Sequence, residues 1–216
     1  MPDALRPGVL ADAHVQAILD RLHAHADAQQ QDPPRTFSDD AKRKRYMQGR
    51  YVALDRDKAE FCYLLCRAMG ARQVVEAGTS FGVSTLYLAA AVHDNGGGRV
   101  IATEYEPSKA REARRNFAEA GVEETIDLRE GDLRETLRTI DVAVDFMLVD
   151  IWTPMARPAL ELVAPRLRRG AVVMCDNIIA VADGYRDYRA FIDDPANGFR
   201  SMTLPFPGGF EMSLRI

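Results

Sequence analysis

Hydrophobic positions follow two different periods along this chain, and the change between them divides it near residue 55. In the first part, apolar residues recur every three or four positions, which is typical of an amphipathic helix. A polar run at 29–34, with two prolines, ends this helix. A second helix is predicted after Ser38, which is suited to cap it, with Asp39 and Asp40 in its first turn. The apolar stripe of the first helix consists of Val15, Ile18, Leu19 and Leu22.

After a third predicted helix at 56–69, which ends at Gly70, short apolar segments alternate with helical ones. This alternation predicts a parallel sheet with helices on both faces. The carboxyl ends of the strands then meet at one edge, where ligands bind. Strands are predicted at 73–77, 99–104, 125–129, 144–149 and 171–175, and helices at 83–92, 107–120, 133–140 and up to 167.

The last two apolar segments, 199–204 and 210–216, are separated by only five residues. Such a connection is too short for a helical crossover, so the two segments are predicted to form an antiparallel pair. The predicted fold is therefore α/β: a Rossmann-like, doubly wound, mostly parallel sheet of seven strands, with an antiparallel C-terminal hairpin. Residues 1–55 are expected to form a helical segment, and 56–216 the α/β domain.

Composition agrees with one compact domain and a small appendage. The chain has 216 residues, 47% of them hydrophobic and 28% charged, which excludes a disordered tail. The longest apolar run, 86–92, is too short to cross a membrane, and the first thirty residues lack the pattern of a secretory signal. Three cysteines without a CxxC pair favour reduced thiols in a cytoplasmic protein.

The charge pattern argues against nucleic acid as a partner. The net charge is −4 and the arginines are scattered. The one dense basic run, 42–45, follows two aspartates and is interpreted as a solvated helix face, with a docking patch as the alternative. Lysine is scarce: the 28 basic residues include only Lys42, Lys44, Lys58 and Lys109.

The first strand-to-helix turn carries the first candidate binding site. It begins at Glu76 and contains Gly78 and Gly82, whose small size lets backbone approach a ligand closely. The middle glycine of the pyrophosphate fingerprint is missing, and Glu76 would repel a diphosphate but suit an ammonium group. The alternative is a tight turn that only packs helix on strand.

Glu104 ends the second strand, where a carboxylate can bind both hydroxyls of a ribose; the alternative is a solvated strand end. Together, Glu76 and Glu104 select a nucleoside with a cationic tail and no phosphate, which describes S-adenosylmethionine. Asp132, after the third strand, could hold the adenine edge, and capping of the next helix is an equally good explanation.

Three oxygen-bearing side chains follow the fourth and fifth strands: Asp150, Asp176 and Asn177. Adjacent strand ends would place them beside one pocket. Two carboxylates and an amide are hard ligands suited to Mg²⁺ or a similar cation. The alternative is that the aspartates cap helices or turns.

From about Lys58 onward, across about three quarters of its length, the chain resembles the class I S-adenosylmethionine-dependent O-methyltransferases of the catechol and caffeoyl-CoA type. The resemblance rests on Val-Val-Glu-Ala-Gly-Thr-Ser-Phe-Gly-Val-Ser at 74–84, Ile-Ala-Thr-Glu at 101–104, Val-Asp-Ile-Trp at 149–152, Cys-Asp-Asn at 175–177, and the closing Leu-Pro and Gly-Gly-Phe.

The resemblance implies methyl transfer from S-adenosylmethionine to a small-molecule acceptor, a phenol, catechol or other hydroxylated metabolite held by Mg²⁺ or a similar metal. It also implies a lid and dimerisation segment at 1–55 and a homodimer. The implied metal ligands are Asp150, Asp176 and Asn177, with Asp150 also catalytic. The implied cofactor-binding residues are Glu76 for the methionine ammonium, Ser84 for its carboxylate, Glu104 for the ribose, Trp152 lining the cofactor and acceptor pocket, and Gly78, Gly82 and Asp132.

The chain departs from this family at Thr153, where members usually carry a lysine assigned as the base or the acceptor-orienting group. Thr153 is interpreted as a helix cap followed by Pro154. Deprotonation of the acceptor would then need the metal alone, Asp150 or a group from elsewhere. The candidates in the N-terminal segment are His14, His23, His25, Tyr46 and Tyr51.

Three other functions stay open. A metal-independent methyltransferase could act on nitrogen or carbon, since an amine acceptor needs little help to lose its proton. A protein could also bind S-adenosylmethionine without catalysis. An NAD-dependent oxidoreductase is opposed by Glu76 and by the missing glycine.

Overall fold

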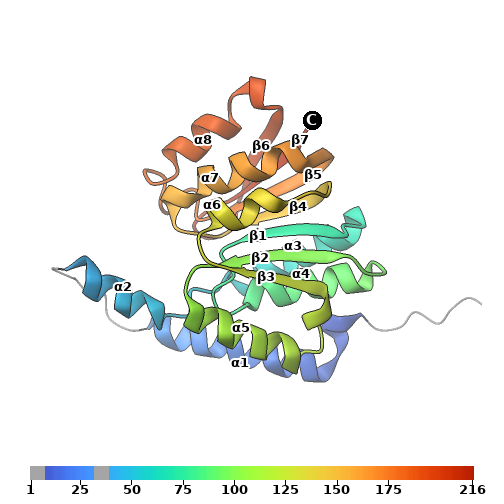
Figure 1. Ribbon diagram of the computed structural model, residues 1–216, viewed down its shortest axis with the longest axis vertical. Coiled ribbons are helices and arrows are strands. Elements are labelled where there is room, and N and C mark those ends of the chain that lie inside the picture. Colours follow the sequence, from blue (N-terminus) through green and yellow to red (C-terminus); the bar gives the residue numbers. More distant parts are fainter. Residues whose placement is uncertain (1–7, 32–38) are drawn as a thin grey trace, which may run out of the picture.

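Seven strands form one sheet in a computed structural model, which describes residues 8–31 and 39–216 (Figure 1). The predicted cap Ser38 lies outside the described residues. The strands are β1 Gln73–Ala77, β2 Arg99–Glu104, β3 Ile126–Glu130, β4 Val144–Val149, β5 Leu167–Asp176, β6 Phe199–Leu204 and β7 Phe210–Arg215. The α-helices are α1 Ala13–Gln30, α2 Asp40–Gln48, α3 Arg56–Met69, α4 Val83–Asp94, α5 Pro107–Glu119, α6 Leu133–Thr136, α7 Thr153–Val163 and α8 Arg186–Ile192.

The sheet has the order β3-β2-β1-β4-β5-β7-β6. Strands β1 to β5 pair in parallel, and β7 is antiparallel to both β5 and β6, which confirms the predicted C-terminal hairpin. The register sets Ala77 opposite Val149, and Val149 opposite Cys175. The carboxyl ends of β1, β4 and β5 are therefore level, and the residues that follow them come together at one edge.

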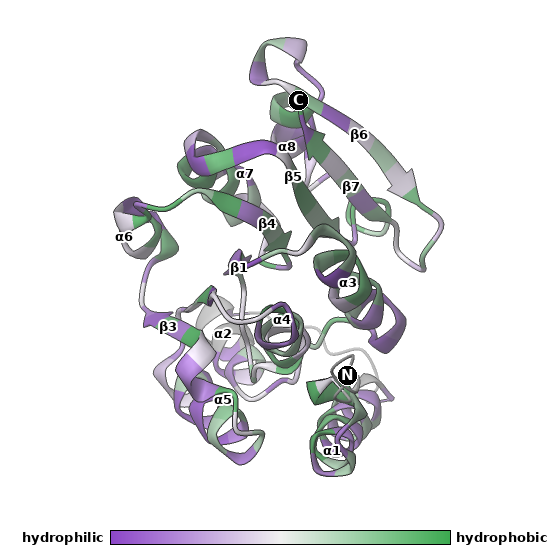
Figure 2. Ribbon diagram, turned by 90° about the vertical axis from the view of Figure 1, so that its right-hand side faces the viewer, coloured by the Kyte–Doolittle hydropathy of each residue, from purple (hydrophilic) through white to green (hydrophobic). Residues whose placement is uncertain are grey.

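The two faces of the sheet are covered by different helices (Figure 2). Alternate residues of β1 enter different cores: Val74 packs with α1, α3, α4 and α5, whereas Val75 packs with α6, α7 and α8. This alternation follows from the period-2 geometry of a strand. The predicted doubly wound α/β class is confirmed.

The first helix belongs to the larger of these two cores. Ile18, Leu19 and Leu22 of α1 are buried with Leu86 and Tyr87 of α4, as the apolar stripe predicts. α2 lies at one end of the molecule and projects from it (Figure 1).

Several predicted boundaries were wrong. The fifth strand begins at Leu167 and not at Ala171, because Leu167 pairs with Val144 and the Arg168 guanidinium binds the Asp145 carboxylate on β4 at 2.5 Å. The preceding helix α7 therefore ends at Val163, followed by a 3-10 turn.

Two shorter differences share a local cause, which is the use of 3-10 turns. The helix predicted at 133–140 is α-helical only to Thr136 and continues as a 3-10 turn. The third strand begins at Ile126 because 123–125 form another 3-10 turn. The helix α8 was not predicted.

Candidate functional site

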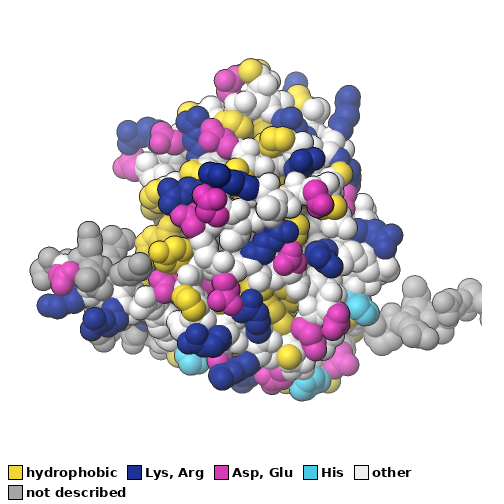
Figure 3. Space-filling view, viewed as in Figure 1, with side chains coloured by type: hydrophobic (Ala, Val, Ile, Leu, Met, Phe, Trp, Pro, Cys, Tyr) yellow, Lys and Arg dark blue, Asp and Glu magenta, His cyan; other side chains and the backbone are white. Residues whose placement is uncertain are grey.

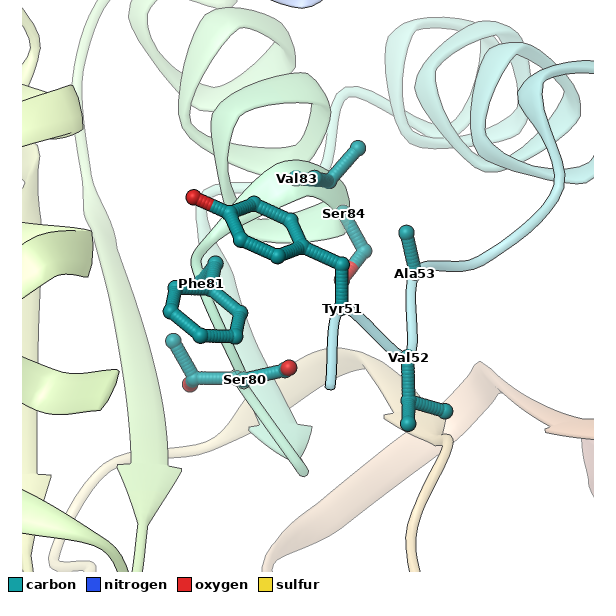
Figure 4. A pocket seen from close by; sticks show the side chains of 8 residues that line it. Tyr51, Val52, Ala53, Ser80, Phe81, Val83 and Ser84 are labelled. Atoms are coloured by element: carbon teal, nitrogen blue, oxygen red, sulfur yellow. The ribbon is translucent and has the colours of Figure 1, made fainter. Parts of the chain in front are cut away.

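The turn after β1 forms the floor of a pocket, as predicted, and its glycines are required by close packing (Figure 4). A Cβ on Gly78 would lie 2.0 Å from the carbonyl oxygen of Asp150, and one on Gly82 would lie 2.4 Å from the Phe117 ring. Both glycines also have positive φ. These two glycines are therefore explained by the close packing of a tight turn, while the residues between them line the pocket.

Ser80, between these glycines, has the features of a residue held for binding. It has a positive φ of 51° although it is not glycine, and its buried hydroxyl has no hydrogen-bond partner. Such a backbone conformation costs free energy and persists where the surroundings enforce it. Here its backbone N–H donates to Glu104 Oε2 at 2.7 Å.

Glu76 is fully buried behind the same turn. Its carboxylate accepts hydrogen bonds from the hydroxyls of Ser84 at 2.6 Å, Thr85 at 2.5 Å and Thr79 at 3.0 Å. Burial raises the pKa of Glu76 to about 6, although the three hydroxyl donors work in the opposite direction. Glu76 and Ser84, predicted to bind the two ends of one amino acid moiety, are thus in direct contact.

Glu104 ends β2 beside this turn and is also buried. Its second oxygen accepts from the backbone N–H of Glu106 at 2.8 Å, and burial raises the pKa of the carboxyl. Asp132 lies at the neighbouring end of β3, where it caps α6 by accepting from Arg134 N at 2.9 Å. The capping interpretation of Asp132 therefore describes its contacts, and a role with adenine stays a prediction.

The segment before α3 covers the pocket from the other side. Tyr51, Val52 and Ala53 line it opposite Ser80 and Phe81 (Figure 4). The rings of Tyr51 and Phe81 stack at 3.8 Å, and His25 of α1 stacks on Tyr51 at 4.1 Å. The N-terminal segment is thereby connected to the turn after β1.

Asp150 directly follows β4, and Asp176 and Asn177 stand at the end of the adjacent strand β5. Asp176 is buried and its Oδ2 accepts from Asn177 Nδ2 at 2.8 Å, while Asn177 has a positive φ of 59°. Burial, and then the charges of Asp176 and Glu76, raise the pKa of Asp150 well above its usual range. The charge of Asp176 therefore acts on Asp150 across the adjacent strand ends.

The chemistry of this donor set suits a hard divalent cation, because adjacent strand ends carry two carboxylates and an amide. Across residues 8–31 and 39–216, no group of three or more His, Cys, Asp and Glu side chains forms a metal site. An ion at this edge would thus depend on Asn177, water and bound acceptor for its remaining ligands.

The sequence reasoning missed Lys58. Its side chain is 1% exposed, and its Nζ lies 2.7 Å from Asp176 Oδ1 and 2.9 Å from Asp55 Oδ2. Burial alone would lower the pKa of Lys58, but the hydrogen bonds to Asp176 and Asp55 raise it overall. A signal for this existed: Lys58, Cys62 and Cys66 are spaced four residues apart, which places Lys58 on the buried face of α3.

The predicted alternatives for a base lie elsewhere. His14 contacts the backbone carbonyl of Glu119, and His23 is buried against the Tyr87 hydroxyl. Arg50 lies over the ring of Tyr46. Tyr51 is the one of these candidates that lines the pocket, and burial raises its pKa, so it stays protonated at neutral pH.

Two further predictions concern the start of α7. The helix begins at Thr153 with Trp152 at the capping position, so the prediction that Thr153 is the cap was wrong by one residue. A Cβ on Gly184 would lie 2.5 Å from Thr153 Oγ1, so the loop after β5 packs directly on this threonine. Trp152 is 55% exposed at the rim of the site.

Exposed hydrophobic side chains gather at this end of the molecule, between α7 and α2 in Figure 3. Trp152 comes from the segment after β4, and Ile179 and Val181 come from the loop after β5. Val52 comes from the segment before α3. In residues 8–31 and 39–216, no helix is long and apolar enough to span a membrane.

Known proteins share this fold and part of this sequence. A family model described as a methyltransferase domain matches residues 75–178. A catechol O-methyltransferase from Mycobacterium tuberculosis is 33% identical over 129 residues, which cover 59% of this chain and 58% of that protein. The chain thus matches less than two thirds of the length of this curated relative.

Two solved structures extend the likeness to nearly the whole chain. Cofactor-bound Rv0187 from MTB superposes with a TM-score of 0.73 at 27% identity, over 92% of this chain and 89% of that one. An O-methyltransferase from Bacillus cereus in complex with SAH has a TM-score of 0.73 at 22% identity, over 93% and 91%, and supports the fold. The chain thus contains a region that matches a methyltransferase domain, and over part of its length it is similar in sequence to a catechol O-methyltransferase.

Proposed function

We propose that this protein transfers the methyl group of S-adenosylmethionine to a hydroxyl of a small-molecule acceptor. The observation that carries the proposal is the pair of buried carboxylates, Glu76 and Glu104, on either side of one backbone turn. Two carboxylates there suit an ammonium group and a ribose and oppose a pyrophosphate.

In this proposal each side chain binds or orients one part of the reactants. Glu76 accepts from the methionine ammonium, Ser84 donates to its carboxylate, and Glu104 accepts from the ribose hydroxyls. Gly78 and Gly82 shape the turn, Asp132 borders the adenine, and Trp152 borders the acceptor. Tyr51 covers the pocket and excludes water, which favours an in-line geometry between donor and acceptor.

Asp150, Asp176 and Asn177 would hold a divalent metal, Mg²⁺ or a similar ion. When bound, the ion would favour the ionised form of an acceptor oxygen and fix its position. The fit is supported by the burial of Asp176 and by its charge, which helps to raise the pKa of Asp150. Asp150 is the carboxylate that we expect to lie closest to the reacting oxygen.

Titration with S-adenosylhomocysteine and a chelator series would test this proposal. We expect S-adenosylhomocysteine to bind in calorimetry, and methyl transfer to a panel of phenols and catechols to stop with EDTA and return with added Mg²⁺. Transfer that is insensitive to the chelator would remove the metal and favour nitrogen or carbon as the acceptor. Binding without transfer to any phenol, catechol or amine would favour a non-catalytic binding protein.

We also propose that residues 1–55 form the lid and dimerisation segment, and that the protein is a cytoplasmic homodimer. The free, buried thiols of Cys62, Cys66 and Cys175 support a reducing compartment. The unpaired edge of β6, with Met202 60% exposed, offers a surface for association. Light scattering on the purified chain would give a mass near twice 24.0 kDa if it is dimeric.

A further inference from the structure

The family lysine expected at position 153 is absent, but the structure brings another lysine to the same edge of the sheet. Lys58 enters from α3, 118 positions before its partner Asp176. Its Nζ is buried and contacts one oxygen of Asp176 and one of Asp55. A lysine with this burial is rare unless it is paired, so the site is built around it.

Asp176 is held at both of its oxygens. Oδ1 accepts from Lys58 and Oδ2 accepts from Asn177 Nδ2, so the carboxylate plane is fixed by two elements, α3 and the end of β5. Ligands that bind metals are themselves commonly oriented by such neighbouring hydrogen bonds. Phe210, fully buried on β7, lies with its ring centre 6.0 Å from Lys58 Nζ and completes the enclosure.

The charges around Asp150 show why a fixed cation matters here. Of the charged groups that act most strongly on Asp150 among the described residues, Asp176, Glu76 and Asp55 are acidic and Lys58 is the cation. Three carboxylates that converge on a fourth would repel one another strongly in a buried site. Lys58 offsets part of this repulsion without occupying a ligand position on Asp150.

Position 153 carries a threonine that packs against Gly184 of the loop after β5, where a Cβ on the glycine would lie 2.5 Å from Thr153 Oγ1. The cation that pairs with the Asp176 carboxylate is Lys58 of α3.

We propose that Lys58 is a positioning residue of the metal site, which fixes the Asp176 carboxylate and supplies a permanent positive charge beside it. This inference rests on the metal part of the proposed function. It assigns a role to the Asp55-x-x-Lys58 segment, which lies before the matched methyltransferase domain at 75–178.

The test is the dissociation constant for Mn²⁺, measured by titration of the whole protein and read by electron paramagnetic resonance. We expect K58M to weaken Mn²⁺ binding by about ten- to a hundredfold, because an oriented ligand loses its support. K58R keeps the charge and should recover most of the affinity. Binding of S-adenosylhomocysteine to both variants should stay within about twofold of the parent, since Lys58 contacts no residue of that pocket.

A matched control comes from the other end of the same helix. Arg67 pairs with Asp94 at 3.1 Å, so R67M also removes a cation of α3 from a carboxylate. It leaves untouched the edge of the sheet with Asp150, Asp176 and Asn177, here called the metal edge. We expect R67M to bind Mn²⁺ like the parent. Circular dichroism of each variant checks that the fold is kept.

K58M that binds Mn²⁺ as tightly as the parent, or more tightly, would overturn the inference, because Lys58 would then compete with the ion. An equal loss of Mn²⁺ affinity in K58M and K58R would overturn the role of the Lys58 charge. If the parent binds S-adenosylhomocysteine and transfers methyl groups but binds no Mn²⁺, the inference fails together with the metal, while methyl transfer stands.

Discussion

Three neutral hydroxyl groups surround the fully buried carboxylate of Glu76. Burying this charge without a cation lowers the stability of the fold before any ligand binds. Burial raises its pKa from 4.5 to about 6, so the ionised form destabilises the fold by about 2 kcal/mol. The cost is present above the folded pKa and disappears as the pH falls to the unfolded value. A bound ammonium group would recover it.

We therefore expect E76Q to be more stable than the parent at pH 7.5, by up to about 2 kcal/mol, and the difference to vanish near pH 4.5. The same change should weaken S-adenosylhomocysteine binding by about ten- to a hundredfold, because a charged hydrogen bond is lost. Urea denaturation at several pH values and calorimetry measure both effects. E76Q that is less stable at pH 7.5 would contradict this account.

Individual site residues could be predicted where the topology alone places them. Glu76, Glu104, Asp150 and Asp176 each stand at or directly after a strand end, and parallel strands bring such ends to one edge. Lys58 could not be paired in this way, because its partner is 118 positions away and the contact depends on how α3 packs on the sheet. Only its spacing from Cys62 indicated burial.

At the scale of the element, the hairpin turn between β6 and β7 holds the loop that carries Asn177. The carbonyl oxygen of Gly208 accepts from the backbone N–H groups of Ile179 and Ala180, both at 2.9 Å. A Cβ on Gly208 would lie 2.6 Å from Asn177 Oδ1. The closing glycines are thus explained by contact with the metal edge as well as by turn geometry.

G208A should therefore do more than strain the backbone, because the new methyl group would also collide with Asn177. Both Gly208 and Gly121 have positive φ, but nothing lies within 4 Å of a Cβ on Gly121, so G121A is the matched control. We expect each to lose about 1 kcal/mol from the backbone, and G208A alone to weaken Mn²⁺ binding as Asn177 is displaced. Equal Mn²⁺ affinities of the two variants would show that Asn177 moves freely.

Elements with strong periodicity were predicted within a residue or two, including α3, β1, β2 and β4. The start of β5 was missed because the ion pair of Arg168 with Asp145 draws polar residues into the sheet, against their local preference. The short helix α8 was missed because seven residues between turns give too little periodicity to recognise.

At the scale of the whole molecule, the parallel pairing of β1 to β5 and the antiparallel ending follow from two sequence features: alternation of strands and helices, and a five-residue final connection. The packing of α1 was predicted only as an apolar stripe, with no indication of its partner. The structure buries that stripe against α4, so the helix that follows the turn after β1 is covered by the N-terminal segment.

L19A tests how firmly this segment belongs to the core. Leu19 is 0% exposed, and its truncation should lower the free energy of unfolding by about 2 to 4 kcal/mol. We expect a single unfolding transition in urea, because α1 shares its core with the sheet. A loss below about 1 kcal/mol, or a separate early transition, would show that α1 is a peripheral element.

The place of β7 between β5 and β6 has a consequence for how the protein is made. Asp176 pairs with Phe210, and Gly208 secures the loop beyond Asn177, so a growing chain that still lacks residues 205–216 has one wall of the metal edge missing. The ribosome shields the most recently added residues, and β7 reaches the sheet only after every other strand has left the exit tunnel. We expect the turn after β1 to form early and the edge that carries Asp176 and Asn177 to close last.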